Sequence, residues 1–207
     1  MNLRQQLTAT CLFIILFANA GLAQTIKRLT LRSDFPAKTV MVSNTNQQAG
    51  EKSPFLVAAA LKENQVQKEF RSLLQFNYDS LPALILKDPT RIASAELVLF
   101  PTNADFLENN YDEPGKLVVQ RIVDNWYDSS TACDNQPRVD SFEVARQKIK
   151  IKRKTPEIRV NVTLLVMDMI LYGNKGFMIR QNNQVVSNTI TGLSFASSLN
   201  DDKLLRP

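Results

Sequence analysis

The chain of 207 residues carries 25 lysines and arginines against 20 aspartates and glutamates, a formal net charge of +5, and it contains no histidine. Without histidine the chain lacks the commonest general base, the usual Ser-His-Asp and Cys-His arrangements and most kinds of zinc site. It also has no glycine-rich phosphate loop and no paired-cysteine metal motif. We therefore expect a protein that is not an enzyme, although a two-carboxylate glycosidase stays formally open because Asp and Glu are plentiful.

The first 23 residues have the organisation of a secretory signal peptide. Arg4 precedes an apolar run over residues 7–17, and small residues follow at the positions that a signal peptidase reads. The run is shorter than the roughly 20 apolar residues that span a bilayer, which disfavours a membrane anchor. We expect cleavage near Ala23, before Gln24, and a secreted protein that is periplasmic, extracellular or attached to the cell surface, with no membrane span in the mature chain.

The mature chain, residues 24–207, is long enough for one domain with a sizeable core and too short for two. It keeps a mildly basic balance, which is consistent with an anionic partner. Cys11 leaves with the signal, so that Cys133 has no partner for an internal disulfide. A lone exported cysteine suggests intermolecular pairing or a free thiol, and the plainer interpretation of Cys133 is a small buried hydrophobe.

Three stretches after the signal are candidates for strands. Residues 25–32 alternate between apolar and polar side chains, and residues 39–42 are expected to form a short second strand. Residues 55–61 are apolar on both faces, which fits either a buried strand or the first turns of a helix, because periodicity does not separate the two over so short a run.

The clearest alternation of the chain lies within residues 70–81. It predicts a dry face and a wet face, with Phe70, Ser72, Leu74 and Phe76 on the first and Arg71, Gln75 and Asn77 on the second. A second alternating run covers residues 95–100 and directs Ala95, Leu97 and Leu99 to the same core. Together the two runs predict half-buried strands of an antiparallel all-β unit.

Residues 101–115 form an acidic, asparagine-rich loop that closes with Pro-Gly. Loops of this length without internal structure are usually functional or disordered. Hard oxygen ligands for a structural Ca²⁺ are available from Asp105, Glu108, Asp112 and Glu113. They follow no metal-binding pattern of fixed spacing, so that a solvated acidic loop without a metal is the favoured interpretation and we expect no cofactor.

The next predicted strand, residues 117–123, runs into the only tryptophan of the chain, Trp126. Such aromatics stack on sugar rings in carbohydrate modules, but a single Trp at the end of a core strand is more often a packing anchor. Its neighbour Tyr127 then points the opposite way and is the better candidate for an exposed platform.

Residues 146–154 are the most basic run of the chain. In a strand, Lys148, Lys150, Lys152 and Lys154 project from one face as a cationic stripe. One interpretation is a surface for an acidic polymer such as a uronate-rich polysaccharide, a teichoic acid or lipopolysaccharide. The other is an edge strand whose lysines prevent aggregation, and the sequence leaves both open.

The last third of the chain alternates again. Residues 158–163 predict a strand, and the strongly apolar residues 164–172 predict a short helical turn over one end of the fold. Gly173 and Gly176 frame a turn before further predicted strands, which cover residues 177–181, 185–190 and 193–196.

Several of these stretches resemble the DNRLRE-type domains, an extracellular β-sandwich family that overlaps a class of carbohydrate-binding modules. The opening core strands are matched by "RSLLQFNYDSLP" and "ASAELVLF". The family's strand, tryptophan and Asn-x-Pro segment, its Val-x-Val-Thr strand and its Gly-x-x-Gly-Phe-x-x-Arg strand resemble "VVQRIVDNWYDSSTACDNQP", "RVNVTLLVMD" and "GNKGFMIR". The likeness covers nearly all of residues 24–207.

The resemblance implies a single-domain antiparallel β-sandwich with a jelly-roll-like arrangement, and it favours a strand for residues 55–61. Relatives within that class suggest an anionic algal polysaccharide as the ligand. Members of the family usually continue with a final strand where this chain reaches Pro207. Either that strand is missing or a partner supplies it, and an open edge would be a docking site.

We therefore expect an exported, non-catalytic module that binds carbohydrate, with Tyr127 stacking on a sugar face and Lys148, Lys150 and Lys152 binding carboxylates. The alternative is a structural or adhesion subunit of a cell-surface assembly, whose partner is a protein. Nucleic acid is not an expected partner, because an exported protein seldom meets it and no basic platform interleaved with aromatics appears.

Overall fold

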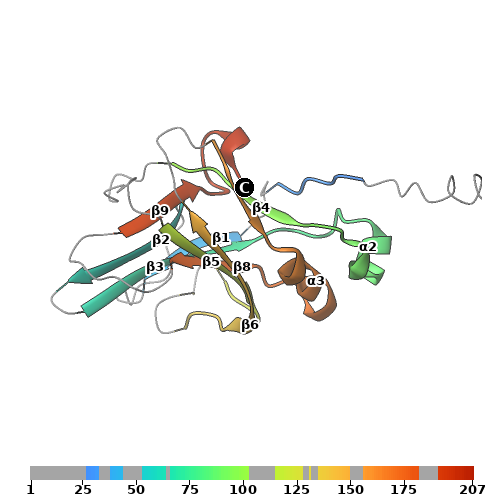
Figure 1. The fold of residues 1–207 in the computed structure, drawn as a ribbon, viewed down its shortest axis with the longest axis horizontal. Coiled ribbons are helices and arrows are strands. Elements are labelled where there is room, and N and C mark those ends of the chain that lie inside the picture. The colour runs from blue at the N-terminus through green and yellow to red at the C-terminus, as the bar shows by residue number, and fades with distance from the viewer. Residues whose placement is uncertain are drawn as a thin grey trace, which may run out of the picture. The chain divides into compact units, whose positions relative to one another are not determined.

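The structure is a computed structural model that describes residues 27–32, 38–43, 53–63, 66–102, 115–127, 131, 135–149, 156–181 and 191–207. The described strands are β1 (Lys38–Ser43), β2 (Phe55–Glu63), β3 (Val66–Gln75), β4 (Glu96–Leu99), β5 (Gly115–Ile122), β6 (Val139–Ile149), β7 (Ile158–Asn161), β8 (Phe177–Gln181) and β9 (Thr191–Ala196). The described helices are α2 (Ala83–Lys87) and α3 (Thr163–Tyr172), with short 3₁₀ turns η1 (Pro89–Arg91) and η2 (Lys203–Leu205) (Figure 1).

The chain divides into two compact units, residues 1–30 and 31–207, and the fold below is that of the second. The strand predicted over residues 25–32 is wrong where the chain is described, because residues 27–32 are in no strand. Leu29 is more than half exposed. Alternation marks which residues are apolar, but a strand also needs a neighbouring strand to complete its hydrogen bonds.

Seven strands form one sheet in the order β6-β5-β8-β3-β2-β9, with β1 paired to β3 beside this path. β4 and β7 form a second, two-stranded sheet, and every pairing between described strands is antiparallel. The prediction of a mostly-β, antiparallel fold is confirmed. Residues 55–61 lie in strand β2, which is one of the two alternatives that the apolar pattern left open. Residues 164–172 lie in helix α3, as their apolar pattern indicated.

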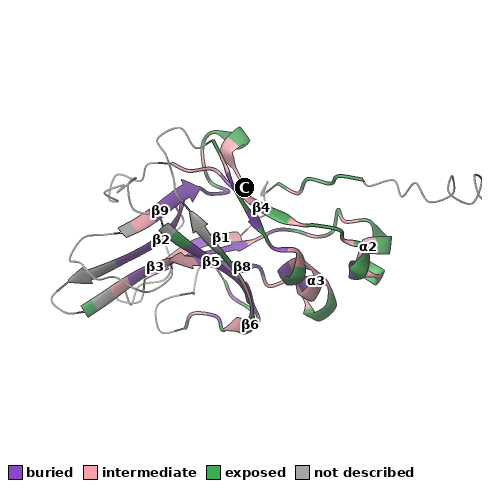
Figure 2. Ribbon diagram, viewed as in Figure 1, coloured by how far each residue is buried: buried purple, intermediate pink, exposed green. Residues whose placement is uncertain are grey.

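One hydrophobic core joins the two sheets and α3. From the larger sheet it takes Leu56, Ala58, Leu74, Leu117, Val119, Phe177, Ile179, Leu193 and Phe195. From the smaller sheet it takes Leu97, Leu99, Ile158 and Val160, and from α3 Leu165 and Met169. Figure 2 shows these buried stretches along the strands and the exposed surface of α2, none of whose residues is buried. The predicted inward direction of Leu74, Leu97 and Leu99 is confirmed.

The other face of β3 is not the wet face that the alternation predicted. Leu73 is completely buried there in a second cluster, whose other buried members are Val40, Val42, Ile122, Trp126 and Met178. The segment after β5 returns across this face and brings Trp126 onto it. Both faces of β3 are therefore covered, and this second cluster becomes the foundation of the candidate site.

Ser72 joins β3 to β2 through its side chain. Its hydroxyl donates to the carbonyl oxygen of Val57 at 3.0 Å and accepts from the Val57 N–H at 2.6 Å. The backbone of Ser72 pairs with Met41 of β1 and with Ile179 of β8. Its contact with Val57 of β2 is made by the side-chain hydroxyl. In chain order, β2 pairs first with β9, over residues 55–60, and then with β3, over residues 59–63, so its backbone is not paired with β3 at Val57.

Ser72→Ala is expected to lower the free energy of unfolding by about 2–4 kcal/mol, because it removes the hydroxyl from two buried backbone groups at once. Ser72 and Val57 are both fully buried, so water does not replace the hydroxyl without rearrangement. Urea unfolding measures the loss. Ser141→Ala, at an exposed strand position, is the control and is expected to change stability by less than about 0.5 kcal/mol; equal midpoints for the two variants would contradict the argument.

The edge of β9 away from β2 is occupied by the chain that follows β4. Ala196 N–H donates to the carbonyl of Phe100 at 2.9 Å, and Thr102 N–H donates to the carbonyl of Ser194 at 3.0 Å. Pro101 lies opposite Phe195 between these bonds. Over residues 194–196, hydrogen bonds within the chain thus cover this edge of β9.

A candidate ligand-binding surface

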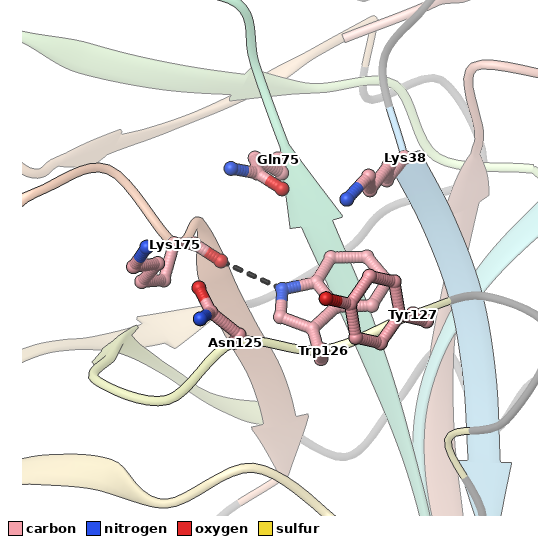
Figure 3. A pocket seen from close by; sticks show the side chains of 6 residues that line it. All are labelled: Lys38, Gln75, Asn125, Trp126, Tyr127 and Lys175. Carbon is pink, nitrogen blue, oxygen red and sulfur yellow. Dashed lines mark hydrogen bonds between the residues drawn. The ribbon is translucent and has the colours of Figure 1, made fainter.

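A pocket of about 250 Å³ opens beside the second cluster (Figure 3). Its lining combines two aromatic rings, two amides and two ammonium groups, from Trp126, Tyr127, Gln75, Asn125, Lys38 and Lys175. Four parts of the sequence meet here: the first residue of β1, the last residue of β3, the segment after β5 and the turn before β8. None of these six lining residues is a carboxylate.

Trp126 forms the floor of the pocket. Its side chain is only 4% exposed and packs in the second cluster, which confirms its interpretation as a packing anchor. Its indole N–H donates to the carbonyl oxygen of Lys175 at 2.7 Å, the bond dashed in Figure 3. This bond ties the segment after β5 to the turn before β8, and so fixes the position of the neighbouring Tyr127.

Tyr127 is 61% exposed, as the sequence predicted for a residue that points away from the core. Its carbonyl oxygen accepts from the backbone N–H of Thr131 at 2.9 Å and from the Thr131 hydroxyl at 2.7 Å. The ammonium of Lys38 lies 5.5 Å from the centre of the Tyr127 ring and 5.9 Å from that of Trp126, within cation–π distance. An exposed aromatic ring and a positive charge therefore stand side by side.

Asp124, which directly precedes the lining residue Asn125, is already paired. Asp124 accepts from Arg138 through both carboxylate oxygens, at 2.9 Å from Nη2 and 3.0 Å from Nε, and also from the Arg138 backbone N–H at 3.0 Å. The side-chain hydrogen bonds from Arg138 lower the pKa of Asp124, and the same bonds raise the pKa of Arg138. The carboxylate is thus directed at Arg138, and the charged side chains among the six lining residues are Lys38 and Lys175.

The turn between α3 and β8 holds Lys175 in place. The amide of Gln75 donates to the carbonyl of Asn174 at 2.8 Å, and the amide of Asn174 donates to the carbonyl of Phe76 at 2.7 Å. The Asn174 side-chain oxygen accepts from the backbone N–H of Gly176 at 3.1 Å. Gly173 and Gly176 flank the turn at φ values of +101° and +90°, which favour glycine.

The predicted ligand-binding residues do not all meet at this pocket. Tyr127 lines it. Lys148 lies in β6 opposite Lys116 of β5, about 20 Å along β5 from Ile122 at 3.3–3.4 Å per residue. Lys150 and Lys152 lie outside the described residues, as do Cys133 and the calcium candidates Asp105, Glu108, Asp112 and Glu113.

Sequence reasoning missed Lys38 and Lys175 as neighbours of Tyr127. Lys38 opens a strand and Lys175 sits in a Gly-Asn-Lys-Gly turn, and neither position carries a pattern that indicates binding. Only the pairing of β1 with β3 and the hydrogen bond from Trp126 to Lys175 bring them to Tyr127.

Within the described ranges, no group of three or more Cys, Asp or Glu side chains is arranged to hold a metal ion. No described helix has the length and apolar character needed to cross a bilayer.

Comparison with known proteins adds no relative. No family model matches the chain. No curated protein matches it significantly. The resemblance to DNRLRE-type domains stays a prediction from the sequence.

Proposed function

We propose that the protein is an exported, non-catalytic β-sandwich module that binds an anionic polysaccharide at the cell surface or outside the cell. The observation that carries this proposal is the exposed Tyr127 ring beside the Lys38 ammonium, in a pocket whose other polar side chains are Asn125, Gln75 and Lys175. Shallow aromatic surfaces with a few polar groups suit a polyhydroxylated ligand, because the apolar face of a sugar stacks on the ring while amides bind its hydroxyls.

The sandwich itself is part of the proposal. One layer consists of β6, β5, β8, β3 and β1. The other consists of β7, β4, β9 and the part of β2 that pairs with β9. Three observations support two layers: the core shared by both sheets, the departure of β2 from β3 at Ser72, and the hydrogen bonds that link the end of β4 to β9. The resemblance to DNRLRE-type domains favours a jelly-roll-like order of these strands.

In the proposed complex, the Tyr127 ring stacks on one sugar residue while Lys38 and Lys175 bind carboxylate or sulfate groups. An exposed ion pair contributes only about 0–1 kcal/mol, so a single site binds weakly. A polymer that engages several sites gains affinity by avidity. Lys148, Lys150 and Lys152 stay candidates for such additional contacts along β6 and beyond it.

Affinity electrophoresis tests the proposal with residues 24–207. The unchanged protein is expected to be retarded in a gel that contains polygalacturonate and to migrate freely in one that contains dextran. Tyr127→Ser combined with Lys38→Gln is expected to weaken binding about tenfold or more, because it removes the stacking ring and one charge. Added salt is expected to weaken binding as well, since the Debye length falls from about 10 Å at 0.1 M to about 3 Å at 1 M.

The matched control combines Leu84→Ser with Lys87→Gln, which removes an exposed apolar side chain and an exposed lysine at α2. This control is expected to bind as the unchanged protein does. Equal retardation in the dextran gel, or free migration in both gels, would count against an anionic-glycan module. Concentration-dependent assembly in sedimentation velocity, with no retardation by polysaccharide, would then favour the alternative of a structural or adhesion subunit.

A further inference from the structure

Strand β6 carries a bulge that exposes an aromatic ring to solvent. Val144 pairs with Gln120 and Val139 with Ile122, so that a single residue of β5, Arg121, lies opposite residues 140–143. Phe142 lies in this bulge, and its side chain is 94% exposed. A phenylalanine so exposed gives almost nothing to the core, and bulges often serve to re-aim a side chain near a binding site.

Hydrogen bonds fix this bulge to the sheet. Asp140 accepts from the Phe142 backbone N–H at 2.9 Å and from the Arg121 guanidinium at 2.7 Å. The side chain of Gln120, itself only 5% exposed, donates to the Asp140 carbonyl at 3.1 Å and accepts from Arg180 Nε at 2.8 Å. Phe142 is thus tied through Asp140 and Gln120 to Arg180 on β8.

Arg180 belongs to a row of three guanidinium groups across neighbouring strands. Val118 of β5 lies opposite Arg146 of β6 on one side and opposite Arg180 of β8 on the other. The register that pairs Ser72 with Ile179 places Arg71 beside Arg180. At about 4.8 Å between strands, Arg146 and Arg180 stand about 10 Å apart across the sheet.

Among the side chains that the structure describes along this row, the three guanidinium groups are accompanied by one carboxylate, that of Glu69. Glu69 pairs with Arg71 at 2.6 Å. Burial lowers the pKa of Arg180, and the neighbouring charges of Arg71 and Arg146 lower it further, while Glu69 acts against them. Lys116 lies in β5 two residues before Val118, and its side chain is exposed. Like charges on facing positions of a sheet repel each other, so an anion bound here would relieve that repulsion.

We propose that Phe142, Arg146 and Arg180 form a second site for an anionic sugar residue, with the sugar face on Phe142 and its carboxylate or sulfate on the guanidinium groups. This inference rests on the proposed function, because the ligand is a further part of the same polysaccharide. Arginine suits the role, since its planar fork binds an oxyanion through two parallel hydrogen bonds. The first site lies at the Gln75 end of β3, four residues from Arg71, or about 13 Å along the strand. A polymer engages both sites, whereas a short oligosaccharide occupies one.

The test uses residues 24–207 with Phe142→Ser and Arg146→Gln combined, since Arg146 is the exposed arginine of the row. The matched control is Leu204→Ser with Lys203→Gln, which removes an exposed apolar side chain and a positive charge at η2. Affinity electrophoresis with polygalacturonate, dextran sulfate and dextran compares carboxylated, sulfated and neutral polymers. Melting temperatures are measured in parallel and are expected to stay unchanged, because both replaced side chains are exposed.

The Phe142→Ser, Arg146→Gln variant is expected to bind the preferred acidic polymer about tenfold more weakly than the control. A larger loss of binding to polygalacturonate identifies a carboxylate as the anionic group of the ligand, and a larger loss of binding to dextran sulfate identifies a sulfate. Undiminished binding of this variant, together with the loss produced by Tyr127→Ser and Lys38→Gln, would overturn the second site and leave the proposed function standing. No retardation of the unchanged protein by either acidic polymer would overturn both.

Discussion

Replacing Gly176 with alanine is expected to lower the free energy of unfolding by about 3–5 kcal/mol. Gly176 has a φ of +90°, and a Cβ on it would lie 2.4 Å from the carbonyl oxygen of Leu74 and 2.9 Å from the Cβ of Gln75. Both neighbours belong to β3, which is packed on its two faces, so they have little room to move away. The variant therefore suffers backbone strain and a steric clash together.

Gly173→Ala is the matched control, because Gly173 has a similar φ of +101° but its nearest neighbour, the Lys175 Cε, is 3.9 Å from the added Cβ. This variant is expected to lose only about 1–2 kcal/mol, the cost of the positive φ. Urea unfolding followed by the fluorescence of the single tryptophan measures both variants. Equal losses would show that the close approach of Gly176 to Leu74 does not matter for stability.

Trp126→Ala is expected to cost about 3–5 kcal/mol of stability and also to abolish binding at the pocket. The replacement empties the space between Leu73, Met178 and the strand β1, and it leaves the Lys175 carbonyl without its 2.7 Å hydrogen bond. Tyr127 follows Trp126 directly in the chain, so its ring loses its fixed place beside Lys38. Stability and binding are therefore expected to fall together.

Trp126→Phe separates the two contributions of this side chain. It keeps an apolar ring in the second cluster but removes the indole N–H, so a smaller loss of about 1–3 kcal/mol is expected. Binding of polygalacturonate is expected to persist at nearly full strength in this variant and to weaken about tenfold or more in Trp126→Ala, because only the first site is lost. Circular dichroism replaces fluorescence as the probe of unfolding, because neither variant contains tryptophan. A melting temperature unchanged by Trp126→Ala would contradict the role of Trp126 in the core.

The Gly176 and Trp126 predictions concern the same connection between β5 and β8. Gly176 accepts from the Ile122 backbone N–H at 2.9 Å, and Lys175, its neighbour, accepts from Trp126. These two bonds connect the end of β5 to the beginning of β8. The pocket is therefore built on a packed part of the fold, which holds its rings and charges in place before any ligand arrives.

Much of the secondary structure was predictable because the individual strands that form the core are amphipathic. The alternation within residues 70–76 and 95–100 placed Leu74, Leu97 and Leu99 correctly in one core. The apolar run after residue 163 was correctly assigned to a helix. The prediction of a strand is wrong over residues 27–32, since alternation alone does not supply a neighbouring strand.

Pairing between distant segments accounts for what the sequence did not reveal about the site. Leu73 falls on the predicted wet face of its strand, and its burial depends on Trp126, which comes from another part of the chain. The sequence singled out Tyr127 as an exposed aromatic and the structure confirms that exposure. It did not indicate Lys38 or Lys175 as neighbours of Tyr127, nor the bulge that exposes Phe142.

The amino-acid sequence by itself determined the antiparallel β character of this protein, the side of its strands that forms the main core, and the exposure of Tyr127. Those properties follow from local periodicity, because side chains alternate along a strand wherever it lies. The tertiary structure alone decided which charges stand beside which rings. Strand register and the return of the segment after β5 across the sheet bring Lys38, Lys175 and Tyr127 together, and contacts between residues so far apart in sequence leave no local pattern to read.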